Sequence, residues 1–183
     1  MRTAFLNTVD SSFWEYAEIA YIRLASYWDR AGQILDFAFF SILQFERDGF
    51  TAVIDRIHTN LVPMNQELRQ RTEWKALRTF QTSDKEDGLQ WLLRRRNLSV
   101  HSIYLRPMSE RGGDVDEEPN GEPLFRYEFN HLEKRLRKKL TPGTALQEIE
   151  RLNKQLTQSA TLFPAVLALC EYAADQRDAQ RWR

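Results

Sequence analysis

The sequence predicts an all-α protein whose first and last helices are long. Apolar residues in both end regions recur at alternating spacings of three and four, which is the period of an amphipathic helix. No segment shows a sustained β-strand pattern. The 183 residues are 42% hydrophobic and 12% aromatic, which suits one domain with a core of ordinary size. We therefore expect a single helical domain over residues 1–183.

The first helix is expected to begin at Ser11 or Ser12, which are good N-cap residues with Glu15 shortly after them. It should end at Gly49. Its middle, "ILDFAFFSIL", is apolar nearly all round, which indicates packing on more than one side, at the centre of a bundle or in a dimer. The heptad-like stripe consists of Phe13, Ala17, Ala20, Leu24, Trp28, Ala31, Leu35, Ala38, Ile42 and Phe45.

Shorter helices are expected in the middle of the chain. The segment "TAVIDRIHTNL" is stopped by Pro63, and another helix begins near Asn65 and runs through "ELRQRTEWKALRTF". Ser83 and Glu86 are spaced as in a capping box, so a further helix should start there and reach about Leu105.

Residues 107–123, "PMSERGGDVDEEPNGEP", are predicted to form an acidic loop, since they combine Pro, Gly and carboxylates with almost nothing to bury. Helix should resume at "NHLEKRLRKKL", and the last helix should start near Thr144. Pro164 should kink this last helix or mark a join in it. Its predicted stripe consists of Ile149, Leu152, Leu156, Ser159, Phe163, Val166, Cys170 and Ala173.

Composition limits the classes of function. Lys and Arg together equal Asp and Glu at 26 each, so a strongly basic surface that coats nucleic acid or membrane is not expected. Cys170 has no cysteine partner and should be a small core residue. The lack of disulfides, of a secretory leader and of an apolar run of about 18 residues predicts a cytoplasmic protein without a membrane span.

The common enzyme motifs are missing from the sequence. There is no phosphate-binding glycine loop, no dinucleotide fingerprint, no HExxH and no nucleophile elbow. Three scattered histidines and one cysteine do not make a common structural zinc site, so we expect neither a metal nor a cofactor.

The stretch "RRRNLSVH" is the candidate site. On a helix, Asn97 and His101 lie four residues apart and share a face, and the long side chain of Arg96 can reach that face. A guanidinium can stabilise a pentavalent phosphate, and an imidazole can move the proton of a ribose 2′-hydroxyl. Spacing alone is weak evidence, because Arg126 and His131 have the separation of Arg96 and His101. A basic helix face that pairs with nearby acids is the open alternative.

The motif and the layout together resemble the HEPN superfamily. "RNLSVH" is similar to its R-x4-6-H signature, in which a polar residue such as Asn often follows the Arg. The all-α layout, the aromatic first helix with "SYWDRAGQILDFAFF" and the long closing helix are also similar, over roughly residues 11–174. A subgroup of stand-alone bacterial members carries such a Y-W-D element.

The resemblance implies a metal-independent endoribonuclease that acts as a homodimer with a composite site. Arg96 would contact the scissile phosphate, His101 would transfer a proton and Asn97 would hold the local geometry. Such proteins often serve as toxins or in phage defence, so an antitoxin or defence-system protein is a possible partner besides RNA. Many toxins paired with nucleotidyltransferases carry Tyr two residues after the His. Here Ile103 takes that position and Tyr104 follows, which puts such modification in doubt.

Other residues have weaker claims. Arg94 and Arg95 could guide RNA or pair with acids, and surface roles are favoured; Arg95 and Tyr104 are candidate substrate contacts. Asp29 is expected to pair with an arginine. Core positions rather than base-stacking platforms are expected for three aromatic residues: Tyr27, Trp28 and Trp91.

Two other functions remain open. One is a non-catalytic HEPN-like scaffold that binds a nucleotide or a protein partner. The other is a plain helical oligomerisation module in which Arg96 and His101 are merely exposed.

Overall fold

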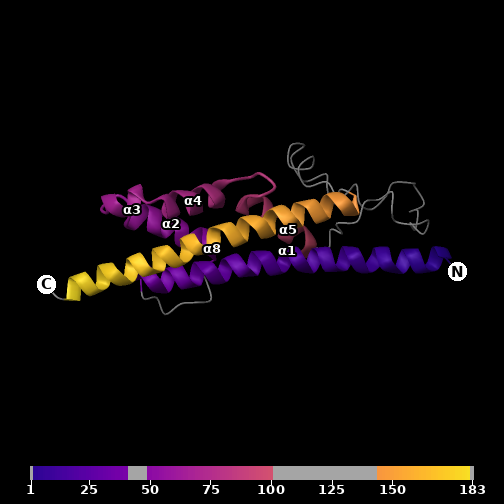
Figure 1. The fold of residues 1–183 in the computed structure, drawn as a ribbon, viewed down its shortest axis with the longest axis horizontal. Helices are drawn as coiled ribbons and strands as arrows, with labels where there is room; N and C mark the ends of the chain where they lie inside the picture. Colours follow the sequence, from indigo (N-terminus) through magenta and orange to yellow (C-terminus); the bar gives the residue numbers. More distant parts are fainter. Residues whose placement is uncertain (1, 41–48, 101–143, 182–183) are drawn as a thin grey trace, which may run out of the picture. The chain divides into compact units, whose positions relative to one another are not determined.

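The computed structural model describes residues 2–40, 49–100 and 144–181, with side chains for 12–40, 49–97 and 144–179. Every element within these ranges is a helix and none is a strand, so the predicted all-α class with long first and last helices is confirmed (Figure 1). The helices are α1 (Arg2–Phe40), α2 (Phe50–Asn60), α3 (Gln66–Gln70), α4 (Thr72–Thr82), α5 (Leu89–Val100) and α8 (Ala145–Arg181). In the described part of the chain, none of them has the length and apolarity needed to cross a membrane.

The contacts divide the chain into two compact units. Unit 1 is Met1–Ile22 with Leu93–Asn153, and unit 2 is Arg23–Leu92 with Lys154–Arg183. Helices α1, α5 and α8 each contribute residues to both units. The acidic loop expected at 107–123 and the helix expected at "NHLEKRLRKKL" lie outside the described residues. A single domain over 1–183 stays a prediction.

Helix α1 begins earlier than the sequence suggested. It starts at Arg2, so a cap at Ser11 or Ser12 is wrong. The physical reason is that "RTAFLNTVD" contains neither Gly nor Pro, so nothing in it interrupts a helix. The expected end of this helix at Gly49 falls beyond residues 41–48, which are outside the described ranges. Gly49 itself is the extended N-cap residue of α2.

The buried stripe of α1 differs in register from the expected one in its first half. Positions 17, 28, 31, 35 and 38 are buried as predicted. Trp14, Tyr21 and Ala25 are buried in place of the expected Phe13, Ala20 and Leu24, which are half-buried. The buried Trp14, Tyr21, Trp28 and Leu35 are seven residues apart, so the heptad period holds and the expected stripe was placed one residue off at three positions of the first half.

An aromatic cluster forms the core of unit 2. Trp28 of α1 lies 4.9 Å from Phe50 of α2 and 4.4 Å from Phe80 of α4, measured between ring centroids. Its indole Nε1 donates a hydrogen bond of 3.1 Å to Ser159 Oγ on α8. Because one side chain contacts three other helices and its only polar atom is paired, Trp28 fixes how these helices pack.

Helix α2 matches its prediction. The single helix predicted after Asn65 is divided into two helices, α3 and α4. Helix α2 ends at Asn60, before Pro63. Asn65 caps α3 as expected, since its Oδ1 accepts the Leu68 N–H at 2.9 Å. The chain then breaks at Arg71, whose ψ of 133° is extended. The Arg71 guanidinium carbon lies 4.7 Å from the centre of the Tyr172 ring on α8. This tertiary contact accompanies a break that local helix propensity does not reveal.

The expected capping box at Ser83 and Glu86 is wrong, because α5 begins at Leu89 and Ser83 ends α4. The Ser83 carbonyl accepts the N–H of Gln90 at 3.1 Å. A Cβ at Gly88 would lie 2.4 Å from that carbonyl oxygen, so the tight turn requires glycine. Buried Gln155 of α8 donates from Nε2 to the carbonyls of Glu86, at 2.6 Å, and Gly88, at 3.1 Å. The linker is therefore held by tertiary hydrogen bonds.

Helix α8 starts where the sequence predicts. Thr144 and Gln147 form a reciprocal cap, in which each backbone N–H donates to the other residue's side-chain oxygen. The helix continues through Pro164, so a join at that residue is wrong. Pro164 has no N–H to donate to the Ala160 carbonyl, four residues earlier in the helix. Both residues are exposed, so water can bind that carbonyl instead.

The inward face of α8 is more polar than predicted. Ser159, Val166 and Ala173 are buried as expected, whereas Leu156 is 59% exposed and Ile149 is also exposed. Glu148 and Gln155, each one residue earlier, occupy the buried positions. A stripe drawn from apolar residues alone is therefore displaced by one position in this half of the helix.

Replacement of Trp28 by alanine should lower the free energy of unfolding by about 3–5 kcal/mol, since it opens a cavity among three helices. Chemical denaturation followed by circular dichroism measures the change. Ile34→Ala on the same helix is the matched control, because Ile34 is 46% exposed and its truncation should cost little. Equal losses for both variants would contradict the assigned core.

Gly32→Ala should destabilise the protein, although alanine favours helix by about 1 kcal/mol over glycine. A Cβ at position 32 would lie 2.6 Å from the Cα and 2.8 Å from the N of Phe50, which are backbone atoms that cannot rotate away. We expect a net loss on the order of 1–3 kcal/mol from this overpacking. An increase in the denaturation midpoint would show that α1 and α2 are not this close.

Candidate functional site

The structure describes part of the predicted motif. Arg96 and Asn97 are consecutive residues of helix α5. Arg96 is half-buried and Asn97 is exposed. The helical path expected from Leu89 to Asn97 is therefore confirmed. His101 and Tyr104 lie outside the described residues, so their relation to Arg96 and Asn97 stays a prediction.

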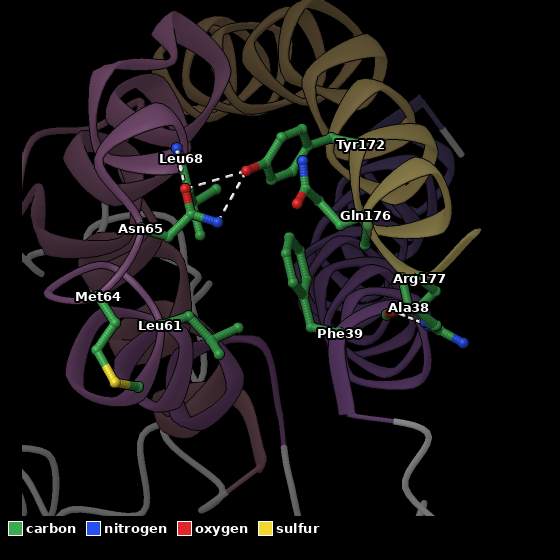
Figure 2. Close-up of a pocket in the computed structure, with 10 residues that line it drawn as sticks. Ala38, Phe39, Leu61, Met64, Asn65, Leu68, Tyr172, Gln176 and Arg177 are labelled. Atoms are coloured by element: carbon green, nitrogen blue, oxygen red, sulfur yellow. Dashed lines mark hydrogen bonds between the residues drawn. The ribbon is translucent and has the colours of Figure 1, made fainter. Parts of the chain in front are cut away.

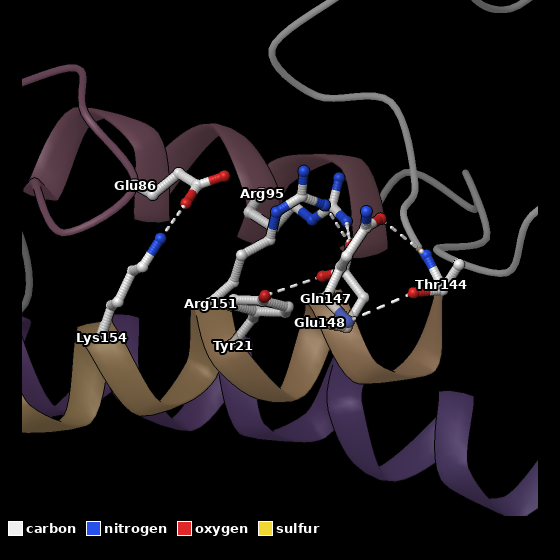
Figure 3. Close-up of polar contacts among 8 residues, drawn as sticks. All are labelled: Tyr21, Glu86, Arg95, Thr144, Gln147, Glu148, Arg151 and Lys154. Carbon is white, nitrogen blue, oxygen red and sulfur yellow. Dashed lines mark hydrogen bonds and ion pairs between the residues drawn. The ribbon is translucent and has the colours of Figure 1, made fainter.

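Arg95, between the two half-buried arginines of the motif, is fully buried. Its side chain is 0% exposed, as is that of Glu148 on α8, and the Arg95 Nη2 donates to Glu148 Oε1 (Figure 3). The surface role favoured for Arg95 is therefore wrong. The reason is that Arg95 lies one turn after buried Leu92 on α5, at a position that points inward, where a cation needs a buried anion. In this conformation a substrate would not reach the Arg95 guanidinium.

Among the side chains that the structure describes, three donate hydrogen bonds to Glu148. The hydroxyl of Tyr21 on α1 donates to Glu148 Oε2 at 2.8 Å, and the Arg151 Nη1 donates to Glu148 Oε1 together with Arg95 (Figure 3). The Arg95 guanidinium carbon also lies 5.7 Å from the Tyr21 ring centre. One carboxylate thereby joins α1, α5 and α8 within unit 1.

Burial keeps the Tyr21 hydroxyl protonated. Desolvation raises the pKa of Tyr21 most strongly, and the negative charge of Glu148 raises it further. The phenol is therefore a neutral donor at physiological pH. With Tyr21 neutral, the charged groups joined by the contacts of Glu148 described above are two guanidinium cations and one carboxylate.

Sequence reasoning missed Glu148. It placed Ile149 on the inward face, because only apolar residues were counted in the stripe. It expected Asp29 as the acid that holds an arginine, but the described residues give Asp29 no ion pair. Its carboxylate faces Gly49 instead, since a Cβ there would lie 2.6 Å from Asp29 Oδ1. On the same helix, Asp36 Oδ1 accepts from Arg56 Nη1 at 2.7 Å.

Most of the other residues singled out in the sequence have structural positions. Trp28 and Trp91 are core residues as expected, and Tyr27 is half-buried, 6.0 Å from Phe163 between ring centroids. Cys170 is half-buried rather than fully inside, and burial raises the pKa of its thiol, with a smaller contribution from the charge of Glu171. A protonated thiol is a poorer nucleophile than a thiolate.

Unit 2 contains a cavity of about 280 Å³ (Figure 2). Asn65 and Tyr172 span it, with the Asn65 amide nitrogen 2.8 Å from the Tyr172 hydroxyl. Arg177 at its edge donates to the carbonyls of Phe37, at 2.9 Å, and Ala38. The lining residues include no carboxylate, imidazole or thiol, so this cavity suits binding rather than acid–base chemistry. They are Ala38, Phe39, Leu61, Met64, Asn65, Leu68, Tyr172, Ala173, Gln176 and Arg177.

Removal of the buried carboxylate should be costly. Glu148→Ala leaves the Arg95 cation buried without this anion, and we expect a loss of about 3–5 kcal/mol in the free energy of unfolding. Glu150→Ala removes an exposed acid from the same helix and is the matched control. Chemical denaturation of both variants checks the difference. Equal midpoints for the two would show that the Arg95–Glu148 pair does not form in solution.

Within the described residues, no three His, Cys, Asp or Glu side chains gather as metal ligands would. Comparisons of the chain with models of protein families, with curated proteins and with solved structures found no match.

Proposed function

We propose that this chain is a metal-independent endoribonuclease of the HEPN type, which cleaves RNA as a homodimer with Arg96, Asn97 and His101 at a composite site. It would act as a toxin or a phage-defence effector, with an antitoxin or defence-system protein as a possible partner. The proposal rests on the resemblance of "RNLSVH" to the R-x4-6-H signature. The structural observation that supports it is the anchoring of α5 by the buried Arg95–Glu148 pair.

The anchored helix provides what the reaction needs from a scaffold. Because Arg95 is bound inside unit 1, the next two residues are carried on a helix of defined orientation, one half-buried and one exposed. Groups held on a rigid element stabilise a transition state better than mobile ones, since they need no reorganisation during the reaction. Arg95 is thus proposed as an anchor of the motif rather than a contact to RNA.

The proposed reaction is attack by a ribose 2′-hydroxyl on the adjacent phosphorus. The 2′-oxygen–phosphorus bond forms and the bond to the 5′-oxygen breaks, which leaves a cyclic phosphate and a 5′-hydroxyl. The Arg96 guanidinium would stabilise charge on the phosphate oxygens, and His101 would take the 2′ proton or donate one to the leaving oxygen. Asn97 would orient the imidazole or the substrate.

Two copies of the chain would supply two imidazoles, one as base and one as acid. Unit 1, which contains the motif, exposes large apolar side chains on both long helices. Exposed apolar residues on a small unit favour burial against another protein surface, and a twofold interface would bring two motifs together. The exposed residues are Tyr16, Ile19, Leu146 and Ile149.

A second candidate is a non-catalytic HEPN-like scaffold that binds a nucleotide or a protein. The cavity of about 280 Å³ in unit 2 favours it, because its amide and phenol groups can fix a small ligand without acid–base chemistry. The two candidates differ in whether RNA is cleaved.

Cleavage of a mixed RNA panel in EDTA tests the proposal. We expect the wild type to cleave and His101→Ala and Arg96→Ala to lose at least about a hundredfold in rate, since each removes a group of the transition state. Matched controls are His58→Ala and Arg69→Ala, which remove an exposed histidine and an exposed arginine of unit 2 and should cleave like the wild type.

Three results would count against this mechanism. Equal activity in His101→Ala and the wild type would indicate another site or a contaminant. Unfolding of both motif variants, followed by circular dichroism, would favour a structural role for the motif. A folded, dimeric wild type that cleaves no RNA in the panel would favour the scaffold.

A further inference from the structure

Arg151 on α8 is a second arginine held by the carboxylate that anchors α5. Its Nη1 and the Arg95 Nη2 both donate to Oε1 of Glu148, so the two guanidiniums converge on one oxygen atom (Figure 3). Arg95 comes from α5 and Arg151 from α8. The Arg151 guanidinium therefore lies beside that of Arg95, the residue directly before Arg96, where α5 and α8 meet in unit 1.

The neighbours of Arg95 flank this position. Successive residues of an α-helix are about 100° apart, so Arg94 and Arg96 lie on either side of the face that Arg95 turns toward Glu148. Both are half-buried, with part of each residue open to solvent. Arg95 of α5 and Arg151 of α8 thus bring two basic groups together at Glu148, and Arg94 and Arg96 flank Arg95 on α5.

Arg151 differs from Arg95 in its access to solvent. The Arg151 side chain is 17% exposed, whereas that of Arg95 is 0% exposed. Both are bound to the same carboxylate, so a polyanion that approaches these two residues can reach Arg151 but not Arg95. Glu148 limits the freedom of the Arg151 guanidinium beforehand, which lowers the entropy lost when that group binds a ligand.

We propose that Arg151 is a substrate-positioning residue that binds a backbone phosphate of the RNA next to the Arg96–Asn97 motif. This inference rests on the proposed function, since it names a further contact for the same substrate. A planar guanidinium suits the phosphate oxygens, and Glu148 acts as the internal anion that orients it. The phosphate groups of a free nucleotide have the same chemistry, so the test separates the two sources.

The test measures binding of a short fluorescent RNA whose 2′-hydroxyls are methylated, so that it cannot be cleaved. Anisotropy is recorded for the wild type, Arg151→Gln and Arg69→Gln over a series of salt concentrations. We expect Arg151→Gln to bind about tenfold more weakly at about 0.1 M salt. The slope of log affinity against log salt should fall in magnitude by about 0.7, the value for one phosphate contact on a single strand. Arg69→Gln, which removes an exposed arginine of unit 2, should leave both unchanged.

A further measurement covers the case in which Arg151→Gln does not fold. The Nε–H signal of Arg151 in ¹⁵N-arginine-labelled wild type, assigned with Arg151→Lys, should shift on titration with the RNA and not with ADP. Arg151→Lys keeps the charge, so its salt slope should match the wild type while its affinity falls, because the planar contact is lost.

The outcomes distinguish this inference from the proposed function. RNA cleavage and binding that are unaffected by Arg151→Gln, with an unshifted Nε–H signal, would overturn the role of Arg151 and leave the nuclease intact. A wild type that neither binds nor cleaves RNA would overturn both. A shift with ADP but not with RNA would replace RNA by a nucleotide as the ligand.

Discussion

A buried cation requires an anion at the same depth, and much of unit 1 depends on this requirement. Neither the Arg95 nor the Glu148 side chain is exposed, and the desolvation of each would be unfavourable without the other. The Tyr21 hydroxyl, which burial keeps neutral, occupies the second carboxylate oxygen. The three partners come from α5, α8 and α1, so the rotation of each helix is coupled to that of the others. A slip of one residue in any of them would separate charge from countercharge.

Unit 2 is specified by different interactions. Its core is aromatic, with Trp28, Phe50 and Phe80 in mutual contact. Apolar packing is not directional, and many arrangements of three rings bury similar area. The polar bonds select among them. The indole N–H reaches Ser159, and Gln155 holds the backbone that leads into α5. Both units therefore combine unspecific burial with a few obligatory polar pairs.

The pattern of the sequence predicted the helices well and their inward faces less well. Helix type follows from local apolar spacing, which is why α2, the start of α8 and the all-α class were correct. The register near Tyr21 was one residue off, because what makes a tyrosine suitable inside is a carboxylate 127 residues away. The same limit explains the error in α8, where Glu148 and Gln155 are buried on account of their partners. Helix α8 has no join at Pro164, because exposure of that face lets water replace the lost bond.

For the proposed site, local reasoning predicted the helical path of Arg96 and Asn97 but not the buried ion pair beside them. Arg96 and Asn97 lie on a helix, as their position after an apolar run indicated. Helical spacing from the buried Leu92 places Arg95 on the inward face, but the carboxylate that allows an arginine there is on Glu148, 53 residues away, and was not predicted. Arg151 carries no local signal at all, because an arginine on a charged helix is ordinarily a solvated residue.

The linker between α4 and α5 has a consequence for sequence divergence. Gln155 binds the main-chain carbonyls of Glu86 and Gly88, not their side chains. The contacts of Gln155 with the linker are thus independent of the side chains at positions 86 and 88. A change of side chain at position 86 over evolutionary time leaves these two hydrogen bonds in place, although it removes the ion pair of Glu86 with Lys154. Gly88 packs so close to the Ser83 carbonyl that only glycine fits. Related proteins that keep this turn should therefore keep a glycine at position 88 and a glutamine at position 155.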